Sequence, residues 1–149
     1  MFSSSKTDLY VFKKALLLAS SLERRFAATE SIFRFTDIQN TPIFADNVIP
    51  TMMVYLGILG LPENLKHTMQ EGEATSVEES YRLRAAAIDG CREIVEVANK
   101  GRDGKKVGSV DFGTKGMLAA NLDVYLWRVA KEPRYRKVPR FACKDTIFF

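Results

Sequence analysis

Apolar and polar side chains alternate with helical spacing in the first part of the chain. From Thr7 to Phe26 the apolar positions fall on one side of a helical wheel, and Lys14 lies on the opposite side. Lys13 lies at the rim of the apolar side, where a lysine packs its aliphatic stem on the core and keeps its ammonium in water. The apolar positions are Val11, Phe12, Ala15, Leu18, Ala19, Leu22 and Phe26. The pattern therefore predicts a first helix with one buried face.

A second apolar region spans residues 38–62, and Asp46 is its only Asp, Glu, Lys, Arg or His residue. The spacing of the apolar positions after Asp46 predicts a helix that ends at Gly57 or Gly60. Either Asp46 or Asn47 would be the N-cap of this helix, because both side chains can accept a backbone hydrogen bond.

Two more helical patterns follow. A short one begins after Pro62 and ends near Gly72. Ser76 and Glu79 have the spacing of a capping box, and they open the longest pattern of the chain, which ends at about Lys100. The apolar stripe of this longest helix consists of Leu83, Ala86, Ala87, Cys91, Ile94, Val95 and Ala98.

The last third of the chain contains a predicted loop, a predicted helix and a predicted extended segment. Residues 101–116 contain five glycines and predict a loop, and Leu118 to Lys131 predicts a last helix. The closing "VPRFACKDTIFF" has a β-like composition and predicts an extended segment. Taken together, the patterns predict an all-α fold, a single compact helical domain over residues 1–149 with a short extended C-terminal segment.

Composition narrows the class of protein. A chain of 149 residues that is 46% hydrophobic can bury a substantial core. The formal net charge is +4, and the basic excess lies mostly after residue 127, which favours an anionic partner. Two cysteines are too few for a disulfide framework or a cysteine-based zinc site, so we expect a cytoplasmic protein. No apolar run approaches the roughly 20 residues that cross a bilayer, so we expect no membrane span.

The available side chains favour carboxylate chemistry. His67 is the only histidine, which argues against a zinc centre and against a Ser-His-Asp triad, and we expect neither a metal nor a cofactor. Asp46 has two competing explanations. As an N-cap it would stabilise its helix by about 1 kcal/mol. As a catalytic group at the mouth of an apolar pocket, its weakly screened charge would act on a developing cation.

Other charged residues lie within the helical patterns. Arg82, Arg84, Asp89 and Glu93 are expected on a solvated face or in surface ion pairs. Asp123 and Trp127 are four residues apart and therefore share one helical face, which would suit a hydrogen bond from the indole N–H to the carboxylate.

Several stretches resemble, in order and spacing, the carboxyl-terminal half of the queuosine salvage family. They are "VFKKALLLASSL", "FTDIQNTPIFADNVIPTMMVYLGIL", "RLRAAAIDGCREIV", "LDVYLWRVAK" and the closing "TIFF", and "IFADNVIP" is the most specific of them. Members of this family are queuosine 5′-phosphate N-glycosylases with a helical fold similar to DNA glycosylases. The resemblance implies cleavage of the N-glycosidic bond of queuosine 5′-monophosphate, which releases queuine for tRNA modification.

The same resemblance implies a set of site residues. It matches Asp46 to the active-site aspartate of the family and Lys13 to a lysine of its helix motif, and both are expected to be catalytic. Lys13 would hold a substrate oxygen or phosphate, or would keep Asp46 ionised by its proximity. The expected substrate-binding residues are Phe44, Asn47, Asp123 and Trp127. The expected partner is the small nucleotide itself, and the reaction requires no nucleic acid.

The chain also departs from the family pattern. Asn47-Val48 replaces a usual Tyr-Arg pair, and the amino-terminal half that contributes to the family pocket has no counterpart before Met1. We therefore expect weak turnover at best from this chain alone, and a homo-oligomer or a separate partner that supplies the missing half. The alternative hypothesis is a non-enzymatic helical module whose basic C-terminal part binds RNA or another acidic partner.

Overall fold

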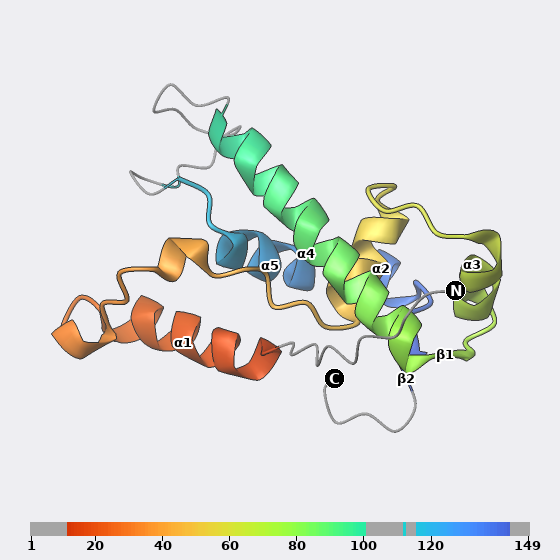
Figure 1. Cartoon of the computed structure of the whole chain (residues 1–149), viewed down its shortest axis with the longest axis horizontal. Coiled ribbons are helices and arrows are strands. Elements are labelled where there is room, and N and C mark those ends of the chain that lie inside the picture. Colours follow the sequence, from red (N-terminus) through yellow and green to blue (C-terminus); the bar gives the residue numbers. More distant parts are fainter. Residues whose placement is uncertain (1–11, 101–111, 113–115, 144–149) are drawn as a thin grey trace, which may run out of the picture.

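The computed structural model describes residues 12–100, 112 and 116–143. Within these ranges the chain is mostly helical and its two strands have two residues each, which confirms the predicted all-α class (Figure 1). The elements in chain order are α1 (Lys13–Phe26), η1 (Ser31–Phe33), η2 (Ile38–Asn40), α2 (Val48–Tyr55), α3 (Glu63–Gln70), β1 (Ala74–Thr75), α4 (Val77–Lys100), α5 (Ala119–Val129), α6 (Pro133–Arg136) and β2 (Ala142–Cys143). Every helix in the described ranges is too short or too polar to span a lipid bilayer.

The core forms where α2, α4 and α5 pack against one another (Figure 1). Six of the eight residues of α2 are buried, so α2 is the central helix and presents apolar side chains on all sides. The two long helices contribute one stripe each. The main core cluster consists of Ile43, Ala45, Ile49, Met53, Ala87, Cys91, Leu122 and Leu126. A β-carbon on Gly90 would lie 2.7 Å from Cε of Met53, so this glycine allows α4 to approach α2 closely.

The longest helix begins as predicted. The backbone N–H of Ser76 donates to the Glu79 carboxylate at 2.9 Å, and the Glu79 N–H donates to Oγ of Ser76 at 3.2 Å. These reciprocal bonds confirm the capping box, and they lower the pKa of Glu79 because Ser76 donates to its carboxylate from both backbone and side chain. The predicted apolar stripe was wrong at Ala86, which is exposed, while Arg84 is buried on the inner face.

The C-terminal part of the chain returns to the segment between α3 and α4. β2 pairs in parallel with β1, with Ala74 opposite Ala142 and Thr75 opposite Cys143. This pairing confirms an extended segment at residues 142–143, and the remainder of the predicted segment after Cys143 lies outside the described residues. Phe141, just before β2, is fully buried against Leu65, Met69 and Leu83 (all in one cluster). The sequence patterns missed α6 and β1, because a four-residue helix and a two-residue strand span only about one period of their patterns.

The first helix differs most from expectation. Its predicted start at Thr7 lies outside the described residues, and the described helix begins at Lys13. The predicted buried face was wrong, because no residue of α1 is buried and Leu18 is 60% exposed. The helix is amphipathic, but within the described residues little of the protein covers its apolar side. Most of the predicted glycine-rich loop at residues 101–116 also lies outside the described residues.

Candidate active site around Asp46

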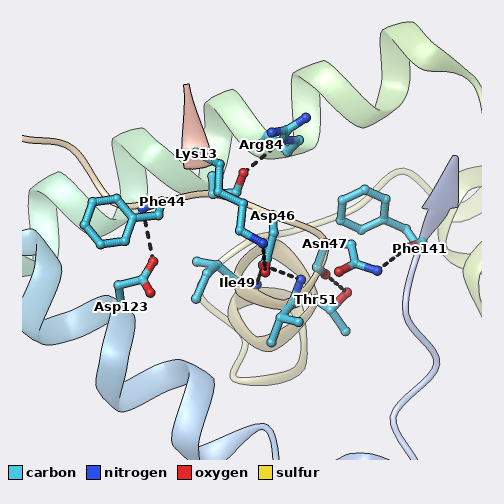
Figure 2. Close-up of polar contacts among 11 residues, drawn as sticks. Lys13, Phe44, Asp46, Asn47, Ile49, Thr51, Arg84, Asp123 and Phe141 are labelled. Atoms are coloured by element: carbon cyan, nitrogen blue, oxygen red, sulfur yellow. Dashed lines mark hydrogen bonds and ion pairs between the residues drawn. The ribbon is translucent and has the colours of Figure 1, made fainter. Parts of the chain in front are cut away.

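Asp46 lies where the chain enters α2, and its side chain caps that helix. Oδ1 of Asp46 accepts the backbone N–H of Val48 at 2.8 Å and the N–H of Ile49 at 3.2 Å (Figure 2). Asn47 occupies the N-cap position of α2 and its side chain makes no capping bond, so the carboxylate of Asp46, one residue earlier, is the acceptor that caps the helix. The negative charge also faces the positive end of the helix dipole. Only 4% of the residue is exposed, so water screens this carboxylate weakly.

Lys13 supplies the counter-charge of Asp46. Its Nζ donates to Oδ2 of Asp46 at 2.8 Å, and the two side chains are 22% and 6% exposed (Figure 2). One carboxylate oxygen is thus held by backbone N–H groups and the other by an ammonium, which fixes the orientation of the carboxylate plane. The cation offsets the cost of burying the negative charge.

Asp123 contacts the segment that leads to Asp46. The backbone N–H of Phe44 donates to Oδ2 of Asp123 at 3.0 Å, so α5 holds the chain two residues before Asp46 (Figure 2). Burial raises the pKa of Asp123 to about 6, against the lowering effect of the Phe44 N–H. The ring of Phe44 is itself buried.

Trp127 does not make the hydrogen bond that its spacing from Asp123 suggested. Among the described residues, the partner of the Asp123 carboxylate is the Phe44 N–H, and the indole of Trp127 is 43% exposed. The ammonium of Lys131 lies 3.1 Å from the centre of the Trp127 ring, an arrangement typical of a cation–π contact. Trp127 lies one helical turn after Asp123, at the edge where α5 meets solvent.

Asn47 connects the start of α2 to the C-terminal segment. Its Nδ2 lies 3.5 Å from the carbonyl oxygen of Phe141, and its backbone carbonyl accepts the hydroxyl of Thr51 at 2.7 Å (Figure 2).

The structure brings five of the six predicted site residues together around the entry to α2, from three segments that lie far apart in the sequence. They are Lys13, Phe44, Asp46, Asn47 and Asp123. Trp127 is the member of the predicted set that lies farthest toward solvent.

Arg84 is the residue of this region that the sequence interpretation placed wrongly. It was expected on a solvated face, yet it is 2% exposed, and its Nε donates to the carbonyl of Ala45 at 3.0 Å (Figure 2). Burial lowers the pKa of its guanidinium. The signal was present in the spacing, because Arg84 lies four residues after the buried Ser80 and seven before the buried Cys91. Arg84 was assigned to the solvated face because its side chain is charged, although its spacing matches the inner face.

A cavity of about 170 Å³ lies on another side of α2 and does not include Asp46. Its walls are Thr51, Val54, Tyr55, Leu61, Lys66, Met69, Gln70, Val138 and Pro139. None of the predicted site residues lines it. In the part of the chain that the structure describes, no three His, Cys, Asp or Glu side chains are grouped as they would be around a metal ion.

The arrangement at Asp46 is chemically specific. An oriented carboxylate with little water around it can stabilise positive charge that develops on a neighbouring molecule, or can orient a water for attack. A search of curated proteins returns no match to this chain. The model of the family described as queuosine salvage protein matches residues 2–149. The match covers the sequence around Asp46 together with nearly all of the rest, and the chain therefore belongs to the queuosine salvage protein family.

Proposed function

We propose that this protein hydrolyses the N-glycosidic bond of queuosine 5′-monophosphate and releases queuine. Membership of the family supports a role in queuosine salvage. The observation that carries the specific reaction is the buried carboxylate of Asp46, which is oriented by two backbone N–H groups and by Lys13. Enzymes that hydrolyse glycosidic bonds use carboxylates, because the transition state resembles a positively charged oxocarbenium ion that a negative charge stabilises.

At C1′ the reaction breaks one bond and forms one, and one proton moves from water to the base. The bond between C1′ of the ribose and the nitrogen of the base breaks, and its electron pair leaves with the base. The oxygen of a water molecule bonds to C1′. One proton of that water is transferred to the base, and the other remains in the new hydroxyl of ribose 5-phosphate. Queuine is a 7-deazaguanine without a ring N7 to protonate, so more of the barrier has to be lowered at the ribose.

Asp46 acts at the ribose in this proposal. Its negative charge stabilises the positive charge that develops at C1′ and the ring oxygen, and one of its oxygens orients the attacking water. Lys13 is the second catalytic residue, and its short contact with Oδ2 supports a role in holding Asp46 ionised and in place. A substrate oxygen that approached Asp46 would also approach the ammonium of Lys13.

The remaining residues of the proposed site bind substrate or support the residues that do. Asp123 holds the backbone at Phe44, and Asn47 holds the C-terminal segment against α2. Trp127 is 43% exposed, and a heterocyclic base can stack on the side of its ring that the Lys131 ammonium does not cover. We propose that Phe44, Asn47, Asp123 and Trp127 form the wall of the nucleotide site next to Asp46.

The test is a product assay with the purified chain. Incubation with queuosine 5′-monophosphate is expected to release queuine and ribose 5-phosphate in equal amounts, measured by liquid chromatography with mass detection. Guanosine 5′-monophosphate is the matched control substrate, and it should remain intact because its base differs in the 7-deaza ring and side chain. Light scattering on the same samples records the oligomeric state in which activity resides. Absence of queuine at every protein concentration, with a folded protein by circular dichroism, would show the proposal to be wrong.

A further inference from the structure

The end of α5 and the whole of α6 form a strongly basic surface. Residues 125–140 contain six Lys or Arg residues and one acid, a formal net charge of +5, compared with +4 for the entire chain. All six cationic side chains are exposed. We call this surface the basic face, and it consists of Arg128, Lys131, Arg134, Arg136, Lys137 and Arg140.

Among the residues that the structure describes, carboxylates neutralise little of this charge. Arg134 lies 3.3 Å from Glu132, the only acid in the stretch. Arg136 and Arg140 instead donate to backbone carbonyls at the end of α5, at 2.8 and 3.4 Å. Carbonyl acceptors hold a guanidinium in position but leave its charge available to an outside anion. The negative end of the α5 dipole accounts for the presence of Arg136 and Arg140 near these carbonyls, but it does not account for a cluster of six cations.

Aromatic rings are interleaved with these cations. Trp127 is 43% exposed and Tyr125 is 63% exposed. Arg128 follows Tyr125 within α5, and Lys131 lies just after the end of this helix. On α5 and α6 both exposed large hydrophobic side chains are aromatic, and none is aliphatic. A surface that inserts into a lipid bilayer also uses aliphatic side chains, and a surface for an acidic peptide does not need rings. Rings between cations suit nucleobases, which stack on them while the phosphates contact the cations.

We propose that the basic face binds single-stranded RNA. The phosphates contact Arg128, Lys131 and the arginines of α6, and one base stacks on the indole of Trp127. Single strands are the expected form, because the bases of a duplex are already stacked on one another. This binding shares Trp127 with the proposed nucleotide site, but its phosphate contacts use cations of the basic face and it does not require Asp46.

The test begins with a fluorescein-labelled 12-nucleotide RNA of mixed sequence and the full chain. Fluorescence anisotropy should report binding that weakens about 20- to 50-fold between 50 and 200 mM salt, which corresponds to three or four contacted phosphates in a single strand. The same RNA annealed to its complement should bind more weakly than the single strand. Trp127 is the only tryptophan of the chain, so its own fluorescence should be quenched by the unlabelled RNA.

Matched variants separate this surface from general charge. Replacement of two cations on the basic face, Arg128→Gln with Lys137→Gln, should lower the affinity about tenfold. Arg82→Gln with Lys100→Gln removes the same charge from α4, where both residues are exposed, and should change the affinity less than twofold. Thermal melts by circular dichroism check that both pairs fold. Asp46→Asn should bind RNA like the unaltered chain.

Several results would overturn the proposal. Equal losses in the two double variants would mean that only net charge attracts RNA. Binding of heparin with the same affinity and no quenching of Trp127 would indicate an acidic partner without bases. Preferential binding to phosphatidylserine vesicles would indicate a membrane surface. Displacement of the RNA by millimolar guanosine 5′-monophosphate would assign the face to a mononucleotide site.

Discussion

The ammonium of Lys13 lies 2.8 Å from Oδ2 of Asp46, and this contact joins the first residue of α1 to the start of α2, 33 positions later in the chain. No residue of α1 is fully buried, so the packing of its apolar face contributes little to its position. The ion pair therefore has two roles, because it helps to place α1 and it determines what surrounds the carboxylate of Asp46.

Lys13→Ala should lower both activity and stability, because it leaves the buried carboxylate of Asp46 without its counter-charge. We expect the free energy of unfolding to fall by about 1–2 kcal/mol, below the full cost of breaking a fully buried pair, since Lys13 is partly exposed. Lys14→Ala is the matched control, and it should change stability by less than about 0.5 kcal/mol because Lys14 is exposed. Urea denaturation and the rate of queuine release measure the two effects. A larger loss at Lys14 would contradict the assignment of Lys13.

Arg84→Met should destabilise the protein although it keeps most of the side-chain volume. The carbonyl of Ala45 loses the donor that Arg84 Nε provides, and an unsatisfied buried carbonyl costs about 1–3 kcal/mol. Activity should fall as well, because Ala45 immediately precedes Asp46. Arg82→Met, two residues earlier, removes an exposed arginine paired with Glu78 and should have little effect. Similar melting temperatures for the two variants would show that the buried bond contributes nothing.

Asp123 should make stability depend on pH in an unusual direction. Burial raises the pKa of Asp123 to about 6 from its ordinary value of 3.8, so between about pH 4 and pH 6 the folded protein binds a proton that the unfolded chain has already released. Stability from this group therefore increases as pH falls through 6 and decreases as pH rises. Asp123→Asn keeps an acceptor for the Phe44 N–H and removes the titration.

The Asn variant should accordingly be the more stable protein at pH 8, by about 1–2 kcal/mol, and the difference should vanish near pH 4. Urea denaturation of both proteins across this pH range measures the difference. Asp89→Asn, at an exposed residue of α4, is the control for the loss of one negative charge. A difference between Asp123→Asn and the unaltered chain that is constant with pH would contradict this account of the carboxyl group.

Local features of the fold were predictable because they depend on residues close in the sequence. The capping box at Ser76 and Glu79 and the cap at Asp46 each join positions two or three residues apart. Spacing predicted the capping box, and the residue types at the start of α2 left Asp46 and Asn47 as the two candidates for its cap. The ends of α2 and α3 were predicted for the same reason, since Gly57 and Gly72 have the positive φ angles that end a helix.

Contacts between distant segments were not predictable from the same patterns. The bond from Arg84 to Ala45 spans 39 positions and that from Phe44 to Asp123 spans 79, and no periodicity relates such pairs. Asp123 was expected to bond with Trp127 because only the local neighbour was visible in the sequence. The apolar side of α1 shows the same limit, because an amphipathic pattern specifies a face but does not specify what covers it.

Asp46→Asn separates the two roles of Asp46. The amide oxygen of Asn can still accept the N–H groups of Val48 and Ile49, so the helix keeps its cap and the stability should change by about 1 kcal/mol. The amide has no negative charge to offer either to Lys13 or to a ribose that develops positive charge. Queuine release should therefore fall at least about a hundredfold, the scale observed when one preorganised electrostatic group is removed.

The charge-matched control for this substitution is Asp37→Asn, which removes an exposed carboxylate from the segment before α2 and should leave the rate unchanged. Thermal melts and queuine-release rates on the same preparations make the comparison. An Asp46→Asn protein that melts normally and still releases queuine at the original rate would show that Asp46 only caps α2. A protein that melts normally and has lost the activity would show that the negative charge, with its orientation preserved, is what the reaction requires.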